Sequence, residues 1–122
     1  NRGQIVPEQI DIYVTTAPAY YEIIYGGTLG GSPSYTSAGD NSIVEYDVAG
    51  TTVTGGEVLD TGFVVTSGTG VTARGNVSAG LLSKLPLVLD KAGANPINLA
   101  VVITGIGGNP VARASITWRE MY

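Results

Sequence analysis

Apolar residues recur at every second position in several short runs of this chain, and this period restricts the fold more than any other feature. In residues 9–16, Ile10, Ile12 and Val14 alternate with other side chains. Similar runs occupy residues 20–25, 42–50, 57–68, 97–104 and 111–119, with Gly, Pro, Asn and Ser between them. A period of two separates the faces of a strand, and short strands between such turn residues are typical of β-sandwiches. We therefore predict an all-β fold, an antiparallel β-sandwich, with a jelly roll as one form that it can take.

The length of 122 residues suits a single domain. We expect that domain to span residues 1–122, with residues 1–8 as a linker from a longer chain. Helix signals are so sparse that we expect fewer than about a tenth of the residues in helices.

The last two runs predict a hairpin that pairs residues 97–104 with 111–119. Residues 106–110 read IGGNP, which is turn chemistry. The run at 97–104 is apolar on both faces and is therefore expected in the middle of a sheet. The alternation places Ile116 and Trp118 in the core, and Glu120 would face the core as well. Because a buried carboxylate is costly unless it is paired, we expect the strand to leave the core after Arg119. Met121 and Tyr122 would then contact a neighbouring subunit.

The residue types exclude most familiar active sites. The chain has no His and no Cys, which removes Ser-His-Asp and Cys-His sites and thiolate metal sites. The only cluster of acids is Asp40, Glu45, Asp47, Glu57 and Asp60. These acids lack the spacing of a calcium-binding loop. Glu45 and Asp47 share one strand face, and we interpret them as solvent-facing. We predict no enzyme activity, no cofactor and no metal site.

The net charge of −4 argues against nucleic acid as a partner, and no stretch approaches the roughly 20 apolar residues of a membrane span. The charge is uneven, because residues 3–73 contain eight acids and no base, whereas residues 74–122 contain five bases and two acids. Two interpretations remain open. The two halves mix their charges in one sheet, or an acidic and a basic face meet in neighbouring subunits.

Three tyrosines, Tyr20, Tyr25 and Tyr35, lie in or beside the long Gly-rich loop of residues 26–41. Tyrosine platforms bind sugars and proteins alike. These residues are candidates for a binding surface, and ordinary strand tyrosines are the alternative interpretation.

Residues 50–122 resemble the terminal β-domains of tailed-bacteriophage virion proteins. The resemblance rests on Gly56 to Val64, within TTVTGGEVLDTGFVV, and on the closing SITWRE, Ser115 to Glu120. It implies a structural virion component, such as a capsid decoration, head fibre or tail protein, made in the host cytoplasm and located in the virion. Its partners would be copies of itself, with a trimer as one arrangement, or other virion proteins. No catalytic residues follow from it.

Two other functions remain open. A carbohydrate-binding module would bind a glycan through Tyr20, Tyr25 and Tyr35. A pilin-like subunit without disulfides would join its neighbours through strands and form filaments.

Overall fold

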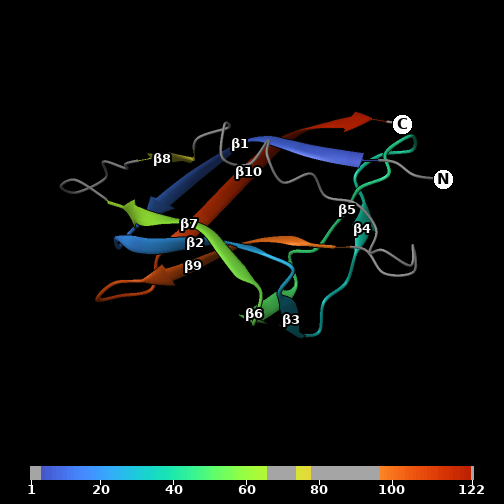
Figure 1. The fold of residues 1–122 in the computed structure, drawn as a ribbon. Coiled ribbons are helices and arrows are strands. Elements are labelled where there is room, and N and C mark those ends of the chain that lie inside the picture. The colour runs from blue at the N-terminus through green and yellow to red at the C-terminus, as the bar shows by residue number, and fades with distance from the viewer. Residues whose placement is uncertain (1–3, 66–73, 78–96, 122) are drawn as a thin grey trace.

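The structure, a computed structural model, describes residues 4–65, 74–77 and 97–121 and is built from strands (Figure 1). These residues contain no helix, and thus none long and apolar enough to cross a membrane. The strands are β1 (Gln4–Thr15), β2 (Ala19–Tyr25), β3 (Thr28–Gly31), β4 (Thr36–Ser37), β5 (Glu45–Tyr46), β6 (Gly50–Thr54), β7 (Glu57–Val64), β8 (Arg74–Val77), β9 (Leu99–Gly105) and β10 (Val111–Met121).

Two antiparallel three-stranded sheets form the body of the described part. One has the order β10-β1-β8 and the other the order β7-β2-β9. Their facing sides share one apolar core, which includes Ile12 of β1, Ile23 of β2 and Val64 of β7. The prediction of an all-β antiparallel sandwich is therefore confirmed, while the jelly roll stays a prediction.

The alternation along β1 explains its place in the centre of the first sheet. Ile10, Ile12 and Val14 have no exposed surface, whereas Tyr13 between them is exposed. The strand already begins at Gln4, which pairs with Met121. Residues 4–8, which we expected to form part of a linker, thus belong to the first strand.

The hairpin predicted at the end of the chain is wrong. The strand β9 pairs with β2, and β10 pairs with β1, so the two strands belong to opposite sheets. The connection between them crosses from one sheet to the other, beside the connection from β1 to β2. The Ile106 amide donates to the Pro18 carbonyl over 2.9 Å, and the Thr16 hydroxyl donates to the Asn109 carbonyl over 3.1 Å. Turn residues permit a sharp change of direction, but they do not specify whether the chain returns to the same sheet.

The position of β9 also differs from the prediction. Among the described strands β9 is at the edge of its sheet, and β2 is in the middle. The expectation that residues 97–104 lie in the middle of a sheet, because they are apolar on both faces, is thus wrong for the described strands.

Two smaller two-stranded sheets extend from the body. β3 pairs with β6, and β4 pairs with β5. The predicted strand at 42–50 is reduced to β5, which has only two residues. We call residues 34–50, which include β4 and β5, the arm; it lies beside the strands at one end of the sandwich (Figure 1).

Candidate functional site

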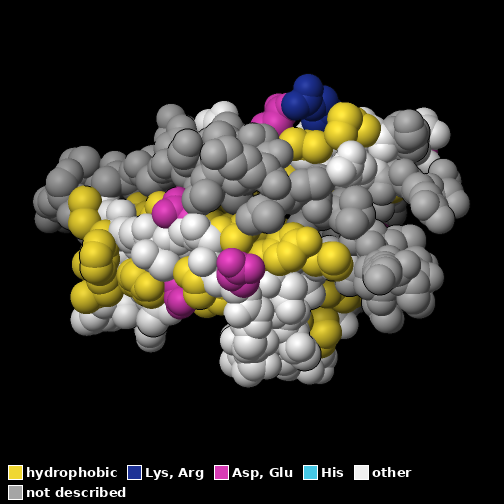
Figure 2. Space-filling model, in the orientation of Figure 1, with side chains coloured by type: hydrophobic (Ala, Val, Ile, Leu, Met, Phe, Trp, Pro, Cys, Tyr) yellow, Lys and Arg dark blue, Asp and Glu magenta, His cyan; other side chains and the backbone are white. Residues whose placement is uncertain are grey.

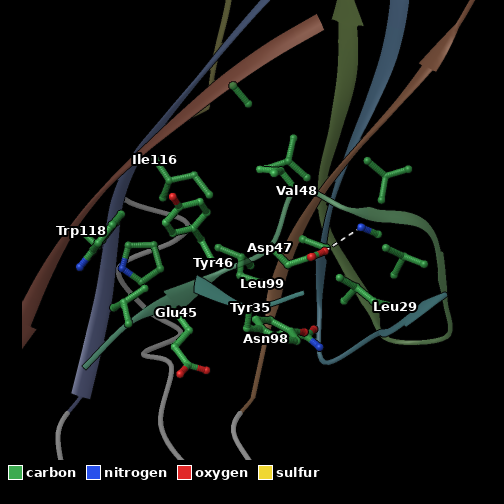
Figure 3. A pocket seen from close by; sticks show the side chains of 18 of the residues that line it. Leu29, Tyr35, Glu45, Tyr46, Asp47, Val48, Asn98, Leu99, Ile116 and Trp118 are labelled. Carbon is green, nitrogen blue, oxygen red and sulfur yellow. Dashed lines mark hydrogen bonds between the residues drawn. The ribbon is translucent and has the colours of Figure 1, made fainter. Parts of the chain in front are cut away.

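An open groove of about 1060 Å³ runs along the side of the sandwich where β9 and β10 lie. Residues of both strands line it, and the arm contributes a further wall (Figure 3). This groove is the candidate functional site.

The floor of the groove consists of side chains on the inner faces of β9 and β10 that stay partly exposed. On β10, Ala114 and Ile116 pair with Ile12 and Ile10, which are fully buried. The same face of β10 also carries Ala112. Nevertheless, both alanines are exposed and Ile116 is only half-buried. On β9, the residues that pack against the core are half-buried as well, namely Leu99, Val101 and Ile103. Within residues 4–65, 74–77 and 97–121, the core is therefore open along these two edges.

The arm places two tyrosines on the rim of the groove. Tyr35 precedes β4 and Tyr46 lies in β5, and their exposed fractions are 50% and 49%. The Tyr46 side chain points toward Ile116, and Trp118 lies on the same side (Figure 3). The groove thus combines an apolar floor with three aromatic side chains.

The carboxylate of Asp47 holds the loops of the arm together. It accepts hydrogen bonds from the backbone amides of Ser34 at 2.6 Å, Gly50 at 2.8 Å and Ala49 at 3.1 Å. The dashed line in Figure 3 marks one of these bonds. The bond from Ser34 is the largest cause that lowers the pKa of Asp47, and the bonds from Gly50 and Ala49 add to it against a smaller effect of desolvation. Since all three donors are backbone amides, the role of Asp47 is to close the loops.

A second carboxylate, Glu120, attaches the arm to β10. It accepts hydrogen bonds from the Trp118 indole Nε1 at 3.0 Å and the Ile43 amide at 3.2 Å, and it also accepts one from the Ser42 hydroxyl. These partners allow Glu120 to lie on the inner face of β10, so the expectation that the strand leaves the core after Arg119 is wrong. The strand continues to Met121, which pairs with Gln4.

Trp118 is not buried in the core as predicted. It is half-buried and lines the groove, as does the half-buried Ile116. Among the residues expected to contact a neighbouring subunit, Met121 is exposed, while Tyr122 lies outside the described residues.

The three tyrosines singled out in the sequence do not come together. Tyr20 and Tyr25 are five positions apart on β2 and therefore point to opposite faces of the strand. Tyr20 packs against Phe63 on the outer face, with ring centroids 5.7 Å apart. Of these three tyrosines, Tyr35 alone lines the groove.

Sequence reasoning missed Tyr46 and Trp118 as site residues. Both lie in runs that alternate like half-buried strands, which made them candidates for the core. No local signal distinguishes a core-facing side chain from one that faces a gap between two sheet edges.

In the described residues, the acids are not gathered into a group of three or more that could hold a metal ion. Glu45 is exposed, as expected, whereas Asp47 is half-buried against its amide partners.

Charges of both halves meet on the outer face of the first sheet. Arg119 of β10 forms an ion pair with Glu8 of β1 over 3.3 Å. Figure 2 shows a basic group beside an acidic one at the top of the view, and further acidic groups lower in the view. Opposite charges are thus mixed within one sheet, at least at this pair.

No protein-family model matches the chain, and neither a curated protein nor a solved structure matches it.

Proposed function

We propose that this chain is a structural β-module that assembles with copies of itself or with neighbouring structural proteins. The setting that the resemblance implies is the bacteriophage virion. The observation that carries the proposal is the open groove between β9 and β10, where residues of the sandwich interior stay half-exposed. We expect no enzymatic activity.

Covering this groove is favourable for physical reasons. Removing apolar surface from water contributes about 25 cal/mol per Å². The described strands leave one edge each of β9 and β10 without a partner strand, and such edges offer backbone donors and acceptors to another chain. A partner that fills the groove therefore gains both apolar contacts and backbone hydrogen bonds.

The native mass of the purified chain tests this proposal. Light scattering coupled to gel filtration, over a range of protein concentrations, should show a discrete oligomer. A chain that stays monomeric up to roughly millimolar concentration, where even weak specific contacts form, contradicts self-assembly. A pilin-like subunit would instead give filaments without a fixed mass.

A second candidate function is glycan binding, which the aromatic rim of the groove favours. Tyr35, Tyr46 and Trp118 line one open groove, and aromatic rings of this kind are amphipathic contact surfaces. A glycan array tests it. Binding should be lost in Tyr46→Ala and kept in Tyr20→Ala, because Tyr20 packs against Phe63 outside the groove. Equal binding by both variants, or no binding by the parent chain, contradicts this function.

A further inference from the structure

We propose that β10 pairs with β10 of a second copy, antiparallel, around a two-fold axis at Ser115. This inference rests on the proposed assembly function and specifies its surface and its partner. The pairing would join two three-stranded sheets into one continuous six-stranded sheet.

The free edge of β10 has the properties of a pairing edge. The strand contains eleven residues, and β1 is its only neighbour in the described part of the molecule. Exposed edges are normally protected by proline, bulges, short length or charged side chains. The charged residues of β10 are Arg113, Arg119 and Glu120, and the last two have partners within the chain. Val111 to Met121 contain neither proline nor glycine. The one register shift between β1 and β10 adds a residue to β1, between Pro7 and Gln9, and leaves β10 regular.

The inner face of β10 is complementary to itself in this register. With the axis at Ser115, Ala114 faces the partner's Ile116 and Ala112 faces the partner's Trp118. Each large side chain thus meets a small, exposed one, and the open positions above both alanines are filled. Cross-strand neighbours lie only about 4.5–5.5 Å apart, so such alternation of size decides which register packs well.

The outer face favours the same register through its charges. Arg113 faces the partner's Thr117, and Arg119 faces the partner's Val111, so no two arginines meet. Moving the axis to Ile116 would place Arg113 opposite the partner's Arg119. That shift would also place Glu120 opposite the partner's Ala112, although Glu120 already accepts hydrogen bonds from Trp118 and from the arm. Like charges directly opposite each other destabilise a strand pair.

The two-fold geometry also explains the open side of the sandwich. An axis perpendicular to the sheet keeps the inner faces of both copies on the same side. The two grooves would then face each other across the new strand pair, and each copy would cover the exposed alanines of the other. By contrast, the inner face of β9 carries the large residues Leu99, Val101 and Ile103, and its one small residue, Gly105, is at the very end of the strand.

A single cysteine tests the axis directly, because the chain has no cysteine of its own. In Ser115→Cys the two cysteines would be directly opposite each other, with their side chains on the same face of the sheet. Their Cα atoms would lie within the separation of about 4.4–6.8 Å that a disulfide requires. Under mild oxidation this variant should form a covalent dimer. Thr117→Cys is the matched control on the same face, because its two copies would be four positions apart along the strand pair. We expect a disulfide yield roughly ten times higher for Ser115→Cys than for Thr117→Cys.

A mixture of Arg113→Cys and Thr117→Cys chains should also form a heterodimer, since these positions face each other in the proposed register. A native oligomer in which Ser115→Cys does not cross-link, or in which Thr117→Cys links better, overturns the β10 pairing and leaves the assembly function standing. A parent chain that stays monomeric overturns both the β10 pairing and self-assembly.

Discussion

At the scale of single residues, Gly62 shows how one side chain determines its neighbour. Gly62 on β7 lies directly opposite Tyr21 on β2, and the buried Tyr21 ring covers it. A Cβ atom at Gly62 would come within 2.9 Å of the ring. The interruption of an apolar run by glycine is thus explained by a close approach of the tyrosine.

We predict that Gly62→Ala destabilises the fold by about 1–3 kcal/mol, because an added methyl group would push a buried ring out of its place. Chemical denaturation followed by circular dichroism measures the effect. Gly39→Ala is the matched control, because a Cβ atom there meets nothing within 4 Å. Equal stability of the two variants would show that the ring yields without cost.

At the scale of elements, the arm depends on carboxylates more than on its own strands. β4 and β5 have two residues each, and a ladder this short contributes little. Asp47 closes the loops of the arm, and Glu120 attaches the arm to the end of β10. The arm should therefore respond to the ionisation of Asp47.

We predict that acid loosens the arm at Asp47. Its folded pKa lies below the usual value, so its contribution to stability is fully present above the unfolded pKa of about 3.9 and is lost as the pH falls through the folded pKa. The amide NMR signals of Ser34 and Gly50 should shift together over this range. In Asp47→Asn that shift should be absent, whereas Asp40→Asn should retain it. The role of Asp47 would be contradicted if these two amide signals in the parent chain did not shift with pH.

The sequence predicted where strands lie better than it predicted which strands pair with each other. Alternation along β9 and β10 indicated strands, and both are present. The predicted hairpin failed because periodicity says which residues share a face but not which strand lies next to it. Pairing with β1 and β2 depends on contacts between distant residues, such as Ile10 with Ile116.

Across the described part of the molecule, the core is centred on β1 and β2, and its side at β9 and β10 is open. We predict that Ile12→Ala costs about 2–5 kcal/mol, the usual range for a large side chain removed from a core. Trp118→Ala should cost less, because Trp118 is half-buried in the groove. Urea unfolding compares the two variants at a protein concentration where the chain is monomeric. A larger loss of unfolding free energy for Trp118→Ala than for Ile12→Ala would show that the indole supports the core directly.

The all-β class and the inner face of β1 could be predicted from the sequence alone, which also shows that His and Cys are absent. These follow from local properties: the period of two, the turn residues between runs, and the residue types present. The three-dimensional fold was needed to see that β9 and β10 lie in opposite sheets and that Glu120 is paired on an inner face. It was also needed to see that one groove is lined by Tyr35, Tyr46 and Trp118. The reason is physical. A strand's faces are encoded within the strand, whereas its neighbours are selected by packing and hydrogen bonding between residues that are distant in sequence.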